Sequence, residues 1–294
     1  MAACAKGIAD HSMDKRWTRP GTLYLVATPI GNLEDMSPRA AEVLREVDLI
    51  AMEDTRVSLP WLRRLGVTAP YVSYHEHSDP ERARALVEKA AEGAAIALVS
   101  DAGLPAISDP GREVVAMAWE AGVAVSVIPG PSAGVSVFAG SGFPLPVTLW
   151  GFLPPRGRAR DEAIVRVLET PGSHVLYEAP NRLEKLFGEL AGHEPDRAAV
   201  VARELSKLHE EWWKGTASEG QLRFASGTVR GEITVVLGPK ASQPNEVDWD
   251  AVLNRVDDEV ARGRSAREAI ETLAREAGIH RKTLYQRWHA RQTT

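Results

Sequence analysis

The fold is decided by residues 96–105, which read IALVSDAGLP, a short apolar run followed at once by a loop of small residues with one carboxylate. The same order occurs at residues 23–32, LYLVATPIGN, and at residues 123–133, VAVSVIPGPSA. In an open α/β sheet the carboxyl ends of the strands face the ligand. Glycine and proline in such loops let the backbone approach a bound molecule closely. We therefore expect three strand ends to form one small-molecule crevice.

Helical signals alternate with these apolar runs. Three predicted helices each begin with serine or aspartate followed by proline, a pair that caps a helix and suits its first turn, and they cover residues 37–47, 79–93 and 109–122. Ser132 can cap a fourth helix toward Gly140, and residues 49–52 form a further strand. This alternation predicts an α/β domain with a parallel sheet over residues 21–143.

A second alternating series follows, and we interpret residues 144–240 as a second α/β domain. Its strands are predicted at residues 147–152, 175–177, 198–202 and 233–237, with helices around 164–168 and 183–190. Residues 240–245 have the composition of a linker. Residues 241–294 are predicted to be helical, with a helix-turn-helix spacing around Gly278. Residues 1–20 show no periodicity and are expected to be a flexible extension.

The composition limits the class of protein. The chain has 294 residues, of which 44% are hydrophobic and 26% charged, as is ordinary for globular domains. Its formal net charge of -5 argues against a uniformly basic coat for nucleic acid, although a local basic patch is compatible with it. Cys4 is the only cysteine, and no apolar run approaches the roughly 20 residues of a membrane span. We expect no disulfide framework, no membrane partner and a cytoplasmic location.

Four later motifs occur in a fixed order with the three loops, and together they resemble one family. They are GFLP at residues 151–154, YEAPNR at 177–182, ARELSK at 202–207 and RGE at 230–232. The ordered set is similar to the ribosomal RNA small-subunit methyltransferase I family over about residues 21–238. The resemblance implies the tetrapyrrole-methylase fold, with a cofactor cleft between two α/β domains, and a homodimer. It also implies S-adenosylmethionine as cofactor and methyl transfer to the ribose 2′-hydroxyl of a cytidine in the decoding region of 16S rRNA.

By the same resemblance, the cofactor-binding residues come from both α/β domains. A sulfonium donor with an adenine and a ribose needs carbonyls or a carboxylate, an apolar slot and backbone donors. The residues implied are Pro29, Asp101, Gly103, Ile107, Ser132, Ala133, Tyr177, Glu178, Arg203, Leu205, Gly231, Glu232, Ile233 and Thr234. Neither G-x-G-x-x-G nor a Walker A loop occurs in the sequence, so no dinucleotide or triphosphate site competes for the crevice.

The implied reaction is an in-line displacement, in which the protein aligns the ribose oxygen and helps its proton to leave. Three residues are predicted to take part: Asp54, Asp101 and, if burial lowers its pKa, Lys207. For Asp54 a loop-capping role is an equally good interpretation. His75 and His77 have no third ligand nearby in the sequence, so no metal site is predicted and contact with RNA is preferred.

Positive charges occur in two places that suit RNA phosphates. Arg156, Arg158 and Arg160 follow a proline pair in a glycine-containing loop, and Arg182 could extend that patch. The alternative is a solvated surface loop, because two acidic residues follow immediately. In the helical tail, Arg281 and Lys282 are predicted to contact RNA, with a helical cap or dimer element as the alternative. The expected partner is 16S rRNA or the small ribosomal subunit.

The sequence departs from the family pattern at three positions. Leu104 replaces a usual threonine, and Ala179 and Asn181 replace a serine and a histidine. These changes remove side-chain hydrogen bonds but leave the backbone amides in place. Two other functions stay open: a methyltransferase of the same fold acting on a small, tetrapyrrole-like molecule, and a non-catalytic protein that senses adenosylmethionine and binds nucleic acid. The basic loops and the helical tail argue against the first of these.

Overall fold

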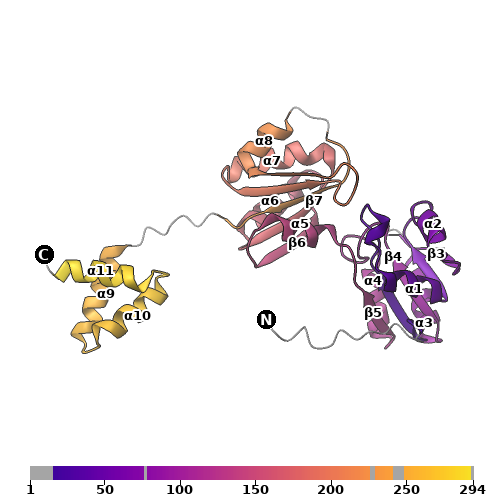
Figure 1. Cartoon of the computed structure of the whole chain (residues 1–294), viewed down its shortest axis with the longest axis horizontal. Helices are drawn as coiled ribbons and strands as arrows, with labels where there is room; N and C mark the ends of the chain where they lie inside the picture. Colours follow the sequence, from indigo (N-terminus) through magenta and orange to yellow (C-terminus); the bar gives the residue numbers. More distant parts are fainter. Residues whose placement is uncertain (1–15, 76–77, 226–228, 241–247, 293–294) are drawn as a thin grey trace. The chain divides into compact units, whose positions relative to one another are not determined.

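The computed structural model describes residues 16–75, 78–225, 229–240 and 248–292. The chain divides into two compact units, Met1–Lys240 and Ala241–Thr294. The first unit contains two five-stranded sheets with their helices, and the second contains three helices (Figure 1). Residues 1–15 of the expected N-terminal extension, residues 241–245 of the expected linker and His77 lie outside the described residues.

The first sheet is parallel throughout and has the order β3-β2-β4-β1-β5. Its strands are β1 Thr22–Val26, β2 Leu49–Met52, β3 Tyr71–Ser73, β4 Ala95–Val99 and β5 Ala124–Ile128. The inner strands β1 and β4 are buried at every position, as expected for a parallel sheet covered on both faces. The strands predicted at residues 23–27, 49–52, 96–99 and 123–128 are confirmed to within one residue at either end, whereas β3 was not predicted.

Helices cover both faces of this sheet, and we call the whole the first lobe. The helices are α1 Pro38–Glu46, α2 Thr55–Arg64, α3 Pro80–Ala91 and α4 Arg112–Glu120. α1 and α2 share one hydrophobic core with the sheet, and α3 and α4 share another. The Ser37 hydroxyl accepts the N–H of Ala40 at 3.1 Å, so the predicted cap of α1 is confirmed. α4 begins later than predicted, after Gly111, whose φ of 135° breaks the helical geometry of the preceding turn.

The second sheet is mixed and has the order β6-β7-β10-β8-β9. Its strands are β6 Val147–Phe152, β7 Ser173–Glu178, β8 Ala198–Arg203, β9 Glu211–Thr216 and β10 Ile233–Leu237. β6 pairs with β7 in parallel, and the other pairs are antiparallel. α6 Arg158–Glu169, α7 Leu183–His193 and α8 Ala217–Phe224 pack on one face around a single core. Strand β9 and helix α8 were not predicted.

The other face of the second sheet is covered by α5 Ala133–Ser141, which directly follows the last strand of the first sheet. Val137 of α5 is fully buried against Val175, Val200 and Val236 of the second sheet. The chain therefore crosses between the sheets before α5 and not after it. We call the second sheet with α5–α8 the second lobe.

Residues 17 and 18 are held by the first lobe, which corrects the expectation of a flexible segment for this part of residues 1–20. The backbone N–H of Trp17 donates to Glu46 Oε2 at 2.7 Å, and that of Thr18 donates to the same oxygen at 3.1 Å. The Trp17 ring packs against the core that α1 shares with the sheet. A polar anchor at the end of α1 therefore fixes the approach to β1, and such an anchor leaves no periodic pattern in the sequence.

His174 on β7 is fully buried in the second lobe, and its Nδ1 accepts the indole N–H of Trp150 at 3.2 Å. Desolvation, together with the nearby Arg197 guanidinium, lowers the pKa of His174 to about 4. The unfolded chain therefore binds this proton more readily than the folded one, so stability falls as the pH drops from about 6.5 toward 4. We expect this residue to reduce the free energy of unfolding by about 3 kcal/mol at pH 4 relative to pH 7.

The measurement is urea unfolding at both pH values for the wild type and for His174→Asn, whose amide can still accept from the indole but does not titrate. The free energy of unfolding should differ less between pH 7 and pH 4 in the variant than in the wild type, by about 3 kcal/mol. An equal pH dependence in both proteins would show that His174 does not control it.

The C-terminal unit is a three-helix domain with its own core. Its helices are α9 Trp249–Ala261, α10 Ala266–Glu276 and α11 Arg281–Gln292. Ile270, Leu273 and Leu284 are buried among them, and the predicted helix pair around Gly278 is confirmed. Among the described residues, no helix is both long and apolar enough to cross a membrane.

Candidate active site

A cavity of about 380 Å³ opens where the loops of the first lobe face the strand ends of the second. The first lobe contributes the loops that follow β1, β4 and β5, and the second lobe contributes the ends of β7 and β8 and the start of β10. Its lining residues are Ile30, Ala102, Gly103, Leu104, Ile107, Ser108, Asp109, Ser132, Ala133, Phe152, Tyr177, Glu178, Ala179, Pro180, Ala202, Leu205, Gly231, Glu232, Ile233 and Thr234.

Backbone hydrogen bonds fix the loops of the first lobe against each other. Thr28 and Gly103 exchange a pair of bonds, at 2.8 Å from the Thr28 N–H and 3.1 Å from the Gly103 N–H. The Thr28 hydroxyl also donates to the carbonyl of Ser100 at 3.1 Å. Gly103 has a φ of 87°, a conformation that favours glycine. The sharp turn therefore places small residues and backbone groups at the cavity wall.

Polar contacts within the second lobe and between the two lobes surround the cavity. The Gly134 N–H at the start of α5 donates to the Tyr177 hydroxyl at 3.2 Å. A side-chain methyl at position 134 would come within 2.9 Å of that hydroxyl, so only glycine fits without movement. On another side of the cleft the Ser206 hydroxyl donates to Asp35. The first contact fixes α5 against β7 within the second lobe, and the second joins the two lobes.

Of the cofactor-binding residues that the resemblance implied, all except Pro29, Asp101 and Arg203 line this cavity. Pro29 precedes Ile30, which takes its place in the wall. The Asp101 carboxylate turns away and accepts the backbone N–H of Asp54 at 3.1 Å. Arg203 lies in a different cavity, where it pairs with Glu211 at 3.0 Å.

Asp109 is the ionisable residue of the cavity that the sequence analysis missed, because its Asp-Pro pair was interpreted as a helix cap. Burial raises the pKa of Asp109 to about 6, and the charges of Asp101 and Glu232 act in the same direction, against a hydrogen bond from Ser100. A carboxylate with such a pKa is an effective proton acceptor near neutral pH. Asp109 therefore lies in the cavity wall with the protonation behaviour expected of a general base.

The three predicted catalytic residues lie outside the cavity lining. Asp54 caps α2 by accepting the N–H of Arg56 at 2.8 Å, and hydrogen bonds from Arg56 lower its pKa. Asp54 and Asp101 instead border a neighbouring hollow of about 360 Å³, which also contains His75. Burial raises the pKa of Asp101.

Lys207 does not meet the condition set for it as a base, which corrects that prediction. Desolvation alone would lower the pKa of Lys207, but its contacts with Glu204 at 2.9 Å and Glu232 at 3.2 Å outweigh it. The pKa is therefore raised, and the amine stays protonated. Its ion pairs instead connect β10 with the loop after β8 and hold the edge of the cavity.

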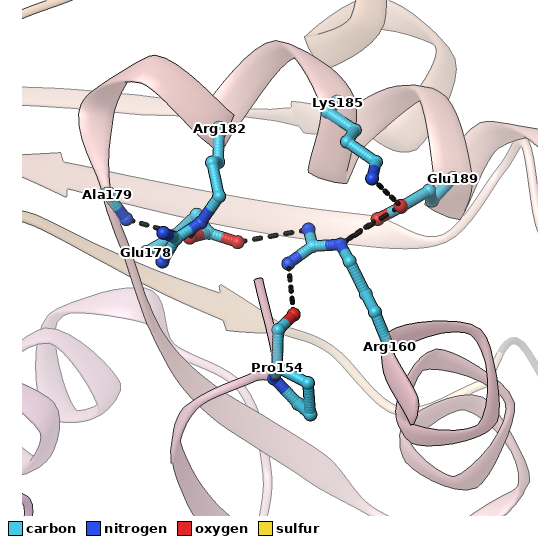
Figure 2. A network of polar contacts seen from close by, with 7 residues as sticks. All are labelled: Pro154, Arg160, Glu178, Ala179, Arg182, Lys185 and Glu189. Carbon is cyan, nitrogen blue, oxygen red and sulfur yellow. Dashed lines mark hydrogen bonds and ion pairs between the residues drawn. The ribbon is translucent and has the colours of Figure 1, made fainter. Parts of the chain in front are cut away.

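Arg160 lies at the centre of a buried polar network, shown in Figure 2, which corrects its assignment to RNA. Its side chain is 0% exposed, because α6 turns it inward to Glu178 at 3.0 Å and Glu189 at 2.8 Å. A third bond goes to the carbonyl of Pro154 at 3.1 Å. No phosphate can reach a guanidinium enclosed in this way.

The same network holds the cavity wall that follows β7. Glu178 Oε1 accepts the N–H of Ala179 at 2.8 Å and Nε of Arg182 at 2.6 Å, while Oε2 binds Arg160. Both oxygens are thus occupied, although Glu178 lines the cavity. Its carboxylate shapes the wall and is not a free group for a ligand.

The remaining predicted RNA-contacting residues described by the structure lie at the surface or near it. Arg158 is 92% exposed and pairs with Glu162, and Arg156 is also exposed. Arg182 is 27% exposed at the rim of the network. His75 is exposed in the first lobe, and Arg281 and Lys282 are exposed at the start of α11. No cluster of three or more His, Cys, Asp or Glu side chains suited to a metal occurs within the described part of the chain.

Residues 22–220 match the family of tetrapyrrole (corrin/porphyrin) methylases. The chain is 38% identical over 275 residues to the ribosomal RNA small subunit methyltransferase I of Halalkalibacterium halodurans, covering 92% of this chain and 95% of the relative. It is 40% identical over 271 residues to the protein of that name from Synechocystis sp., covering 90% and 96%. The solved structure of a diphthine synthase shares the fold, with a TM-score of 0.57 and 18% identity over 74% of this chain and 90% of that one. The chain therefore belongs to the tetrapyrrole methylase family, and within it to the ribosomal RNA small subunit methyltransferase I group.

Proposed function

We propose that this protein transfers a methyl group from S-adenosylmethionine to the ribose 2′-hydroxyl of a cytidine in the decoding region of 16S rRNA. The observation that carries the proposal is the cavity between the lobes, whose walls contain most of the residues that the family resemblance implied. The names of the relatives support an rRNA acceptor. The nucleotide and the ribose position are proposed from the resemblance, as are a homodimer and a cytoplasmic location.

The chemistry of the cavity fits the cofactor. Ile30, Leu104 and Ile107 give apolar surface for an adenine, while Ser132 and Ala133 bring backbone groups to the wall. The carboxylates of Asp109 and Glu232 suit a ligand that carries a sulfonium charge. When bound, S-adenosylmethionine supplies an electrophilic methyl group.

The chain's own contribution is alignment and removal of a proton. Asp109 would accept the proton of the ribose hydroxyl as the new oxygen–carbon bond forms and the sulfur–carbon bond breaks. The products are the 2′-O-methylated nucleotide and S-adenosylhomocysteine. Arg156, Arg158, Arg182 and, in the C-terminal unit, Arg281 and Lys282 are proposed to bind phosphates of the RNA.

The test is methyl transfer from labelled S-adenosylmethionine to small ribosomal subunits that lack the native modification, followed by mapping of the labelled nucleotide. We expect one ribose-methylated cytidine in the decoding region. Calorimetric binding of S-adenosylmethionine without transfer to subunits or to free 16S rRNA would favour a small-molecule acceptor or a sensing role. Failure to bind S-adenosylmethionine would refute the assignment of the cavity.

A further inference from the structure

A second cavity, of about 370 Å³, opens at the same strand ends of the second lobe but on the face covered by α7 and α8. Ile233 lines both cavities, so the two lie on either side of the start of β10. None of the roles proposed above uses this second cavity. We call it the arginine pocket, because Arg203, Arg223 and Arg230 line it.

The floor of the arginine pocket is apolar and partly aromatic. Trp213 and Phe224 lie in it, with their ring centroids 5.3 Å apart, together with Leu183 and Val201. Trp213 and Phe224 pack against the core of the second lobe but are only partly buried, so part of their surface reaches the pocket. A flat apolar group such as a nucleobase can pack on a floor of this kind.

The rim of the pocket carries more positive than negative charge. Glu211 pairs with Arg203 at 3.0 Å and with Arg223 at 3.4 Å, and it is the only carboxylate in the lining that the structure describes. The Arg230 side chain is exposed, and its carbonyl accepts Nη1 of Arg203 at 3.4 Å. The lining thus contains three guanidinium groups and one carboxylate, an excess of two positive charges. An excess of positive charge at the rim favours an anionic ligand.

We propose that the arginine pocket binds a nucleotide of the acceptor RNA close to the one that is methylated, with the base on the apolar floor and a phosphate on the guanidinium rim. The inference rests on the proposed function and extends it to a second subsite. An apolar floor with a cationic rim matches the two parts of a nucleotide, since bases stack on aromatic rings and phosphates pair with arginine. The shared residue Ile233 keeps the two subsites within reach of one RNA strand.

The test compares the full-length wild type with the double variant Arg223→Gln/Arg230→Gln. Both side chains are exposed, so the fold should be kept. The control is Arg63→Gln/Arg84→Gln, which removes two exposed charges from the first lobe. The probe is a fluorescently labelled single-stranded oligoribonucleotide with the decoding-region sequence, titrated at several salt concentrations.

We expect the pocket variant to bind the oligoribonucleotide at least tenfold more weakly at low salt. Its plot of log affinity against log salt should be shallower by about 1.4, from two lost contacts to a single strand. The control should bind like the wild type, and S-adenosylmethionine affinity should be unchanged in both variants. A 4-thiouridine in the oligoribonucleotide should crosslink to peptides that contain Trp213 or Phe224.

An affinity and a salt slope equal to those of the control would overturn the proposal. A changed oligomeric state of the pocket variant, with unchanged RNA affinity, would also overturn it, because the pocket would then bind a second copy of the chain. Weaker RNA binding by the variant, with no methyl transfer by the wild type, would refute the proposed function and leave the pocket as an RNA site. Methyl transfer by the wild type, together with wild-type RNA affinity of the variant, would support the proposed function and refute the pocket as an RNA site.

Discussion

Replacement of Arg160 by methionine is expected to destabilise the protein by about 3–5 kcal/mol, because removing one partner of a buried ion pair leaves the other charge uncompensated. The residue stranded in this case is Glu178, whose side chain is 1% exposed. Arg182 would still bind one of its oxygens, but the oxygen that faces Arg160 would lose its donor. The carbonyl of Pro154 would lose a donor as well.

The measurement is urea unfolding at pH 7, monitored by tryptophan fluorescence. Arg158→Met is the matched control, since Arg158 lies on the same helix and is exposed, and its ion pair with Glu162 should contribute less than about 1 kcal/mol. The double variant Arg160→Met/Glu178→Gln should recover part of the loss, because it removes the stranded charge. If Arg160→Met unfolds at the same urea concentration as Arg158→Met, the network does not stabilise the fold.

The second large effect is expected from Asp109→Asn, which should lower kcat by about 10²- to 10⁴-fold, the usual contribution of a general base. The amide has nearly the shape of the carboxylate, and Glu232 keeps its negative charge in the cavity, so the loss of affinity for S-adenosylmethionine should be small compared with the loss of kcat. Since only the ionised carboxylate accepts a proton, kcat/KM of the wild type should rise with pH up to about 6, the pKa of Asp109, and then level off. This rise should be absent in the variant.

Asp101→Asn is the matched control, because the Asp101 carboxylate is close to Asp109 but lies outside the cavity lining. It should keep the rise of kcat/KM with pH, with a midpoint shifted to lower pH through the loss of a neighbouring negative charge. If Asp109→Asn retains the wild-type kcat and pH profile, the proton must leave by another route.

Most of the fold could be predicted because its strands are short apolar runs bounded by glycine, proline or caps. β9 could not, since its sequence EWWKGT contains only two apolar residues and three polar ones within an edge strand. The helix α2 was missed because it contains Pro60, a residue that usually ends a helix. The local sequence pattern therefore does not predict a strand or helix whose conformation depends on pairing or packing with distant residues.

The candidate site, like the fold, could be predicted from the sequence only in part. Small residues in loops after strands could be located from the sequence, since their conformational freedom depends on the loop itself. The roles of Arg160, Lys207 and Asp109 could not, because each depends on carboxylates or hydroxyls supplied by distant segments. Arg160 in particular follows Arg156 and Arg158 in the sequence, yet the first turn of α6 points it into the interior.

The position of α5 affects how the protein can be divided into fragments. A fragment that begins at residue 144 would expose Val175, Val200 and Val236 to water, and it should aggregate or fail to fold. A fragment that begins at residue 129 would retain α5, which covers that face of the second sheet. Ala133 at the start of α5 thus belongs to the second lobe, while Gly103 is bonded to the first. Since Gly103 and Ala133 both line the cavity, any opening of the cleft would change the distance between them and with it the shape of the cofactor site.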